Sequence, residues 1–246
     1  MSILDKLRKL FIPRPCVICD EPLSYDLKIP LCDDCLSIWD KHLDVKCVKC
    51  GKTGMNCTCV PSELKRNFPF VCWSVFYTGS KALLSPDVIV YNLKQVLSVS
   101  TIGFCAEMMR RAIISQCKAH NVSYKDFAVT FTPRSEENVC QYGFDQSREL
   151  AKEISKLLDI EFVECFENTG KKEQKKLDRF GRLQNARLSY VLKKDFQLMH
   201  KKYFLVDDVL TSGATLFVCG RLLYDVGADT VVPVTYCKDN IDKGEK

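Results

Sequence analysis

The chain has 246 residues, of which 46% are hydrophobic and 27% charged, and its net charge is +5. Its longest apolar runs are far too short to span a bilayer, and residues 1–12 lack the apolar core of a signal peptide. We therefore expect a soluble, cytoplasmic protein. The length leaves room for one full α/β domain and one small module.

The first twelve residues have an amphipathic pattern. Leu4, Leu7 and Phe11 fall on one side of a short helix, with Lys6 and Lys9 on the other. We expect this helix to dock on the rest of the protein or on a partner. Contact with an anionic membrane is the alternative, and it would place the protein peripherally at the inner face of the membrane.

Cysteine dominates the next segment, because eight of the 15 cysteines fall within the first 59 residues in four closely spaced pairs. Two cysteines on one tight turn present two thiolates to a tetrahedral ion, and a second pair completes its shell. The pattern predicts structural Zn2+ binding, with up to two ions. Sequential pairing is the simplest arrangement, and an interleaved pairing is equally compatible with the spacing. The candidate ligands are Cys16, Cys19, Cys32, Cys35, Cys47, Cys50, Cys57 and Cys59.

A disulfide framework is the competing interpretation of these cysteines. It requires an oxidising compartment, to which nothing in the sequence directs the chain. The other seven cysteines are scattered singly, which is typical of free thiols in a reducing cytosol. Four thiolates per ion leave no open position for water, so a structural role is favoured over a catalytic one.

A composition shift at residues 61–67 predicts a boundary between a zinc-binding module, 1–66, and a larger domain, 67–246. Strands alternate with helices beyond it, which predicts an α/β fold with a mainly parallel sheet and helices on both sides. Asp145 is well placed to cap one helix. The expected strands are 70–77, 127–132, 160–166, 203–208 and 230–236, and the expected helices are 86–119, 146–158 and 216–226.

The segment 168–202 is strongly basic, with 11 Lys and Arg residues against three acidic ones. Its balance of +8 leaves −3 for the rest of the chain, so the positive charge is concentrated here. Such a concentration indicates a polyanion partner such as single-stranded DNA, and a solubilising loop is the plainer alternative. The candidate nucleic-acid residues are Lys171, Lys172, Lys175, Lys176, Arg179, Arg182 and Arg187.

Residues 203–226 carry the most informative pattern of the chain. A buried strand is followed by Asp207 and Asp208, then by a loop of small and hydroxyl residues, then by a helix. Backbone N–H groups at a helix N-terminus bind phosphate, so the order predicts a site for a phosphorylated sugar. A carboxylate cannot bind phosphate, so the two carboxylates must face ribose hydroxyls or Mg2+. The alternative interpretation of the segment is an ordinary βα turn. The loop residues are Thr211, Ser212, Gly213, Ala214 and Thr215.

This segment resembles the loop that binds 5-phosphoribosyl-1-pyrophosphate (PRPP) in type I phosphoribosyltransferases. The resemblance implies that Asp207 and Asp208 hold the ribose hydroxyls at the catalytic centre and that the loop wraps the 5-phosphate. It also implies a fold of type I phosphoribosyltransferase (Rossmann-like) kind. In that family, the segment corresponding to 168–202 is a mobile flap over the substrate.

Over nearly its whole length the chain is similar to the ComF family of competence-associated proteins, which join a cysteine-rich zinc ribbon to such a domain. The matching stretches include Tyr77-Thr-Gly79 and the element Tyr142-Gly-Phe-Asp145-Gln146. Where the family usually has Arg and Asn, this chain has Tyr142 and Asp145. We expect Lys94 and Arg134 to neutralise a pyrophosphate, and the alternative is that each is a solvated surface charge.

Two classes of function follow from the resemblance. One is a PRPP-binding protein of DNA uptake and natural transformation, which handles single-stranded DNA near the uptake machinery. The other is an active phosphoribosyltransferase, which transfers 5-phosphoribose from PRPP with Mg2+ to a nucleobase-like or other acceptor. Pyrophosphate release separates the two classes, because a binder does not require it.

Overall fold

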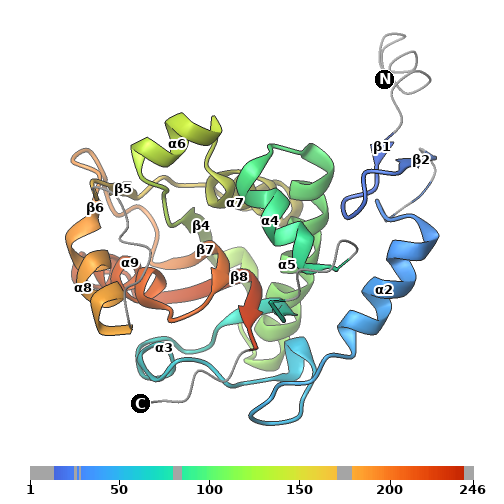
Figure 1. The fold of residues 1–246 in the computed structure, drawn as a ribbon. Helices are drawn as coiled ribbons and strands as arrows, with labels where there is room; N and C mark the ends of the chain where they lie inside the picture. The colour runs from blue at the N-terminus through green and yellow to red at the C-terminus, as the bar shows by residue number, and fades with distance from the viewer. Residues whose placement is uncertain (1–13, 25–26, 28, 80–84, 171–178, 241–246) are drawn as a thin grey trace.

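The computed structural model describes residues 14–24, 27, 29–79, 85–170 and 179–240 (Figure 1). The expected amphipathic helix at 1–12 and the candidate lysines Lys171, Lys172, Lys175 and Lys176 lie outside these residues. The elements, in chain order, are β1 (Arg14–Pro15), β2 (Pro22–Leu23), α2 (Asp33–Leu43), the short 3-10 helix η1 (Gly54–Asn56), α3 (Ser62–Asn67), β3 (Cys72–Tyr77), α4 (Asp87–Gln95), α5 (Val99–Ala119), the 3-10 helix η2 (Tyr124–Asp126), β4 (Ala128–Phe131), α6 (Glu136–Tyr142), α7 (Gln146–Leu158), β5 (Phe166–Asn168), α8 (Arg179–Ser189), β6 (Tyr190–Leu192), β7 (Lys202–Leu210), α9 (Ala214–Asp225) and β8 (Thr230–Asp239).

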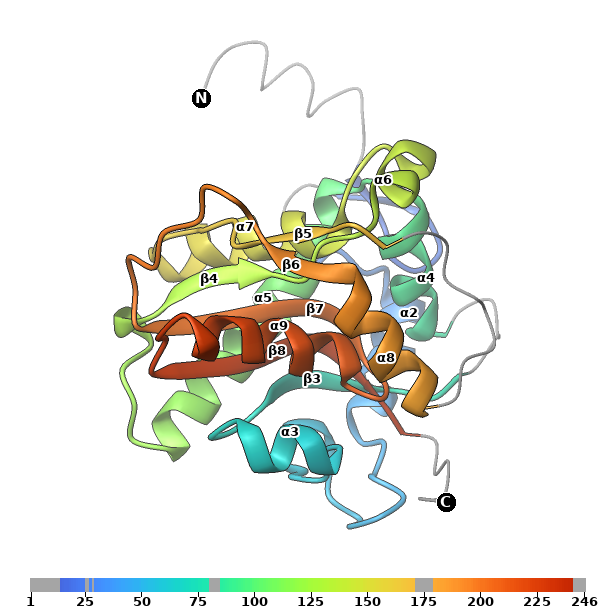
Figure 2. The ribbon, with the colours of Figure 1, turned by 90° about the vertical axis from the view of Figure 1, so that its left-hand side faces the viewer.

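A parallel sheet with the strand order β3-β8-β7-β4 forms the centre of the molecule. Helices α5 and α7 cover one face, and α3, α8 and α9 lie on the other (Figures 1 and 2). The predicted α/β fold with a mainly parallel sheet is therefore confirmed. The carboxyl ends of adjacent parallel strands meet at one edge of such a sheet, and this edge is where ligands bind.

The alternation of side chains along β7 divides the core into two clusters. Phe204 and Val206 pack in a cluster with residues of α5 and α7, whereas Tyr203 and Leu205 pack in the cluster that contains residues of α9. All four side chains are fully buried. A continuous apolar run is what a strand covered on both faces requires.

Residues of the cysteine-rich segment belong to both of these hydrophobic clusters. Cys16 and Cys35 are buried in the cluster that includes α5 and α7, and Cys47 and Cys57 in the one that includes α9. Residues on both sides of the predicted boundary at 66 and 67 thus pack in common cores. The division of the chain into two domains stays a prediction.

The expected helix at 86–119 is wrong as a single element. It is two helices, α4 and α5, separated at residues 96–98, where Val96 takes an extended conformation. The Ser98 side chain accepts a hydrogen bond from the Thr101 N–H at 3.3 Å and so caps α5. A serine within an apolar periodic stretch is the signal for such a new helix start.

The strand expected at 160–166 is wrong in its extent. Only Phe162 forms a bridge, parallel to Val129 beside β4, and Phe166 instead begins β5, which pairs antiparallel with β6. The other four expected strands and the helices at 146–158 and 216–226 are found within three residues of their predicted bounds. Asp145 caps α7 as predicted, by accepting a hydrogen bond from the Arg148 N–H.

Among the described residues, no helix has both the length and the apolar character needed to cross a membrane.

Candidate functional site

Asp207 and Asp208 lie close to the carboxyl end of β7, in the middle of the molecule. The Asp208 side chain is buried and that of Asp207 is half-buried, and the Asp208 N–H donates to Asp207 Oδ1 at 2.9 Å. Burial, and next the charge of Asp208, raises the pKa of Asp207 to about 8. The pair therefore includes one carboxyl that gains or loses its proton close to neutral pH.

The first turn of α7 supplies two partners to the acidic pair. Gln146 Nε2 donates to Asp208 Oδ2 at 3.1 Å, and Ser147 Oγ donates to Asp207 Oδ1 at 3.2 Å. The sequence pattern did not identify either as a site residue. The available signal was the Asp145 cap, which fixes this turn beyond β4, the strand next to β7 in the sheet.

Thr132 adds a third contact to the pair. It follows β4 directly, its N–H donates to the Val206 carbonyl at 3.0 Å, and its buried side chain is hydrogen-bonded to Asp207. The acidic pair is thus contacted by side chains from the end of β4 and from the first turn of α7. The sequence placed a strand at 127–132, but did not predict the contact.

The loop at residues 211–215 turns the chain from β7 into α9. Thr211 is exposed, and Ser212, Ala214 and Thr215 are half-buried. Gly213 is the N-cap of α9 with φ +75° and offers no side-chain acceptor to the N–H groups of the first turn. Only Ser212 Oγ accepts from this turn among the described contacts, at 3.4 Å from the Ala214 N. The N-terminus of α9 therefore has the N–H groups and the dipole that favour an anion.

The two cations expected near a pyrophosphate lie in this region. Lys94, in the last turn of α4, places Nζ 3.5 Å from Asp208 Oδ2, and the charge of that carboxylate raises the pKa of Lys94. Arg134 follows β4 and donates from Nη2 to the Lys94 carbonyl at 3.0 Å. That the two cations neutralise a pyrophosphate stays a prediction.

Tyr142, which stands where the ComF pattern has arginine, packs against Arg134. The Arg134 guanidinium carbon lies 4.9 Å from the centre of the Tyr142 ring and 5.5 Å from that of Phe144. A guanidinium over an aromatic face is attracted by the ring quadrupole. Tyr142, which replaces the arginine of the ComF pattern, thus positions Arg134.

Asp145, which stands where the pattern has asparagine, also contacts Arg134. Its carboxylate accepts from the Arg134 N–H at 2.6 Å and from the Arg148 N–H at 3.2 Å. A carboxylate at a helix N-terminus is stabilised by the helix dipole. The negative charge that Asp145 adds therefore lies at the N-terminus of α7, where it caps the helix.

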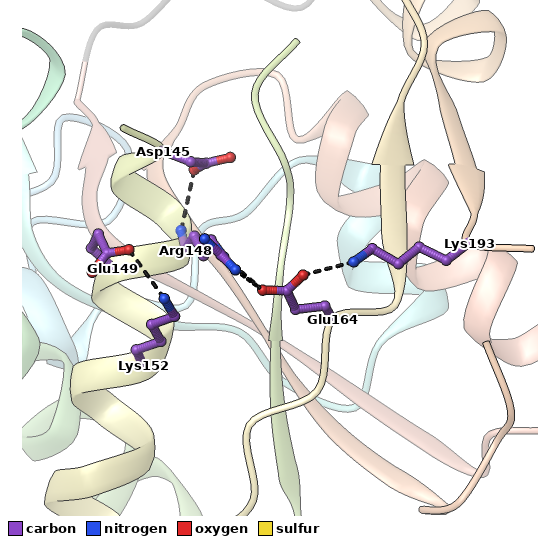
Figure 3. Close-up of polar contacts among 6 residues, drawn as sticks. All are labelled: Asp145, Arg148, Glu149, Lys152, Glu164 and Lys193. Carbon is purple, nitrogen blue, oxygen red and sulfur yellow. Dashed lines mark hydrogen bonds and ion pairs between the residues drawn. The ribbon is translucent and has the colours of Figure 1, made fainter. Parts of the chain in front are cut away.

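A charged triad ties α7 to the hairpin formed by β5 and β6 (Figure 3). Arg148 Nε donates to Glu164 Oε1 at 2.6 Å, and Lys193 Nζ donates to Glu164 Oε2, also at 2.6 Å. Lys193 directly follows β6, and Glu164 precedes β5. The triad connects the turn that contacts the acidic pair with the hairpin from which the basic segment extends.

The described candidates for nucleic-acid contact lie on α8. Arg182 and Arg187 are exposed on this helix, while the side chain of Arg179 is outside the described residues. Phe180 and Leu188 are also exposed, at 69% and 80%. Helix α8 packs against α9, whose N-terminus follows the loop at 211–215. Basic and aromatic side chains thus lie on a helix next to the candidate phosphate site.

The eight N-terminal cysteines form two clusters in which the pairing is sequential. Cys16, Cys19, Cys32 and Cys35 make the first cluster, and Cys47, Cys50, Cys57 and Cys59 make the second. Within each cluster the four Sγ atoms lie within 4.8 Å of one another. The interleaved pairing, which the spacing left open, is excluded.

The first turn of each cluster has the same backbone form. The N–H of the leading cysteine, Cys16 or Cys47, donates to the carbonyl five residues later, and its own carbonyl accepts from the residue four positions on. That fourth residue, Asp20 or Gly51, has a positive φ of 61° or 70°. The left-handed residue closes a tight turn that presents both thiols of the pair to one point.

The sulfur spacing fits a tetrahedral thiolate site. Zn–S bonds of about 2.3 Å place two thiolates of a tetrahedron about 3.8 Å apart. Cys19 Sγ and Cys32 Sγ are 3.6 Å apart, and Cys50 Sγ and Cys57 Sγ 3.7 Å. Each cluster can therefore hold one zinc ion with four sulfur ligands.

No protein-family model matches the chain. It is 23% identical over 202 residues to competence protein ComFC of Streptococcus pneumoniae, an alignment that covers 82% of this chain and 84% of that protein. It is also 29% identical over 128 residues to ribose-phosphate pyrophosphokinase of Sulfurisphaera tokodaii. The second alignment covers 44% of this chain and 43% of that protein.

The similarity to ComFC spans most of both chains, whereas the similarity to the pyrophosphokinase spans less than half of each. The two four-cysteine clusters fit the cysteine-rich zinc ribbon of the ComF family, which the sequence resembles. The chain is thus similar to ComFC over most of its length, and it joins two N-terminal four-cysteine clusters to an α/β domain with a mainly parallel sheet.

Proposed function

We propose that this protein binds PRPP at the carboxyl end of β7. One observation carries the proposal: the paired carboxylates of Asp207 and Asp208 lie a few residues before a glycine-capped N-terminus of α9. Hydroxyl-binding and phosphate-binding groups then follow one another along a single turn of chain. Ribose 5-phosphate offers these two kinds of group at neighbouring positions.

In this proposal, the loop residues 211–215 hold the 5-phosphate through N–H groups and the hydroxyls of Thr211, Ser212 and Thr215. Asp207 and Asp208 accept from ribose hydroxyls or hold Mg2+, whose charge they can balance. Lys94 and Arg134 face the pyrophosphate. Lys94 is paired with Asp208 in the structure, so a ligand that binds Asp208 competes with this ion pair.

The test is a calorimetric titration of PRPP with Mg2+ into the zinc-loaded protein. We expect saturable binding that weakens about 100-fold in Asp207→Asn/Asp208→Asn, because two carboxyl groups that contact the ligand are lost. Asp126→Asn is the matched control, since Asp126 is an exposed carboxylate that precedes β4 at the opposite end of the strand. Absence of binding in the wild type, or equal weakening in the control, contradicts the proposal.

We further propose a role in DNA uptake, in which the protein handles incoming single strands in the cytosol beside the uptake machinery. Support comes from the name of the similar ComFC protein, a competence protein, and from the charge of the segment 168–202. The exposed Arg182, Arg187 and Phe180 offer cations and an aromatic face, which single-stranded DNA requires. The division of the chain at residues 66 and 67 belongs to the same proposal, with the zinc module as the small domain.

Salt-dependent binding of an oligonucleotide tests this role. Each lost phosphate contact lowers the slope of log affinity against log salt by about 0.7 for single strands, so Arg182→Ala/Arg187→Ala is expected to lower it by about 1.4. The control is Arg111→Ala/Lys156→Ala, two exposed cations on α5 and α7. If the slope changes equally in both variants, or in neither, the proposed DNA contact of α8 is contradicted. The helix is then a flap or a solvated surface.

Catalysis is the second candidate function, and the environment of Asp207 favours it. A carboxyl with a pKa of about 8 is suited to proton transfer near neutral pH, which a site that only binds does not need. The reaction would transfer phosphoribose from PRPP to an acceptor and release pyrophosphate. Pyrophosphate release above the rate of PRPP hydrolysis by the Asp207→Asn variant, measured with a panel of nucleobases, would establish it. If PRPP binds but no acceptor gives pyrophosphate release, catalysis is contradicted and the binding function remains.

A further inference from the structure

Lys238 is a buried cation in the central sheet. It lies near the end of β8, between Phe76 of β3 and Leu210 of β7 in the strand register. Only 7% of the residue is exposed, and its Nζ lies 5.4 Å from the centre of the Trp73 ring and 5.1 Å from that of Phe76. No carboxylate forms an ion pair with Lys238 anywhere in the described part of the chain. A buried ammonium without a counter-charge costs several kcal/mol, so this lysine requires another source of negative charge.

The second four-cysteine cluster lies within reach of this ammonium. Lys238 Nζ is 3.9 Å from Cys57 Sγ, one of the four candidate ligands of this cluster. Four thiolates around a divalent ion leave a net charge of −2 on the site. We propose that Lys238 is the charge partner of the metal bound by the second cluster, and that it increases the affinity of this cluster for zinc.

An independent contact joins the end of β8 to the same cluster. The Asn240 side chain accepts from the Val48 N–H at 3.2 Å and donates to the Lys46 carbonyl at 2.9 Å. Both backbone groups flank Cys47. The strand that carries Lys238 therefore also holds the first turn of the second cluster, so the lysine is fixed relative to the sulfur atoms. Groups that orient or balance metal ligands in this way commonly change metal affinity by about 10- to 100-fold.

The first cluster provides an internal control for this inference. Among the described residues, no lysine or arginine is hydrogen-bonded to the thiols of Cys16, Cys19, Cys32 or Cys35. Its sulfur spacing is nevertheless similar to that of the second cluster. A change at Lys238 should therefore act on one of two sites that have the same ligand set in one molecule.

The experiment is a chelator titration of the full zinc-loaded chain, followed by alkylation and peptide mass spectrometry to assign each released ion to its cluster. We expect Lys238→Met to weaken zinc binding at the second cluster by about 10- to 100-fold and to leave the first cluster unchanged. Lys238→Arg should retain most of the affinity. Lys202→Met is the matched control, because Lys202 is a lysine of the neighbouring strand that is paired with Asp126 and lies at the opposite end of the β7–β8 pairing from Lys238.

Lys238→Gln is a second neutral variant, for use where methionine does not fold, and the same loss at the second cluster is expected. Equal zinc affinity of the second cluster in wild type and neutral variants overturns the inference, as does equal loss from both clusters. A second cluster that takes up no zinc in the wild type also overturns it. None of these outcomes depends on PRPP, so the inference and the proposed function fail separately.

Discussion

The two four-cysteine clusters have the same ligands and similar first turns but different attachments to the sheet. The first reaches it through α2, whose Trp39 ring lies 5.0 Å from that of Phe104 and whose His42 Nε2 lies 2.7 Å from the Phe76 carbonyl. The second meets the end of β8 directly at Lys238 and Asn240. One cluster thus positions a helix, and the other is attached to the edge where the strands end.

The second cluster is also connected to the loop at residues 211–215. Its buried cysteines belong to the hydrophobic cluster that includes Leu64, Leu210 and Leu216. Leu64 comes shortly after Cys59 and is fully buried, and a Cβ at Gly213 would lie 2.8 Å from its Cδ1. Leu210 and Leu216 flank the loop at 211–215. The difference between the clusters therefore predicts that only the second supports the loop.

Removing one ligand from each cluster has the largest expected effect. Cys16→Ser and Cys57→Ser both replace a buried thiol, and each should cost one zinc ion and more than about 4 kcal/mol of unfolding free energy. Only Cys57→Ser should also increase hydrogen exchange at residues 209–217 and weaken PRPP binding. Metal analysis, thermal unfolding and exchange mass spectrometry measure these three quantities. Equal exchange in the two variants would remove the distinction between the clusters.

Gly213→Ala tests the contact between Leu64 and the loop. The residue at this position has φ +75°, which costs a non-glycine residue about 1–2 kcal/mol, and the new Cβ would overlap Leu64. We expect PRPP binding to weaken at least about tenfold, measured by calorimetry. Gly213→Ala/Leu64→Ala relieves the overlap but not the strain in φ, so it should recover only part of the loss. Full recovery would mean that φ at this position is not restrictive.

The sequence identified those features that depend on neighbours along the chain. Asp207, Asp208 and the loop after them follow a buried apolar run, so strand, acidic pair and helix start could be placed without tertiary information. The contacts of Gln146 and Ser147 join segments about 60 residues apart, and no local pattern encodes them. The pairing of the cysteines also depended on the path of the chain between the turns.

The break between α4 and α5 had a different cause. Apolar periodicity continues across residues 96–98, so only the Ser98 cap distinguishes two helices from one. At 160–166 a short apolar stretch was read as a full strand, although only Phe162 pairs with β4. Both errors arise because local periodicity is compatible with more than one tertiary arrangement. Neither affects the placement of the acidic pair on β7.

The pH dependence of stability provides the smallest and most local test of the comparison. The folded-state pKa of Asp207, about 8, is above its unfolded value of about 3.9, so the folded protein binds this proton more strongly. The resulting stabilisation is complete below about pH 4 and is lost as the pH rises through about 8. Asp207→Asn should therefore have a flatter stability profile between pH 5 and 8 than the wild type, measured by denaturant unfolding.

The same profile distinguishes the two clusters. If the second cluster holds the loop over the acidic pair, water reaches Asp207 in Cys57→Ser, and its pKa falls because burial is the larger cause of the shift. The slope of stability against pH should then decrease in Cys57→Ser and stay as in the wild type in Cys16→Ser. An unchanged slope in Cys57→Ser, with zinc lost from the second cluster, would show that the burial of Asp207 depends on the sheet and α7 alone.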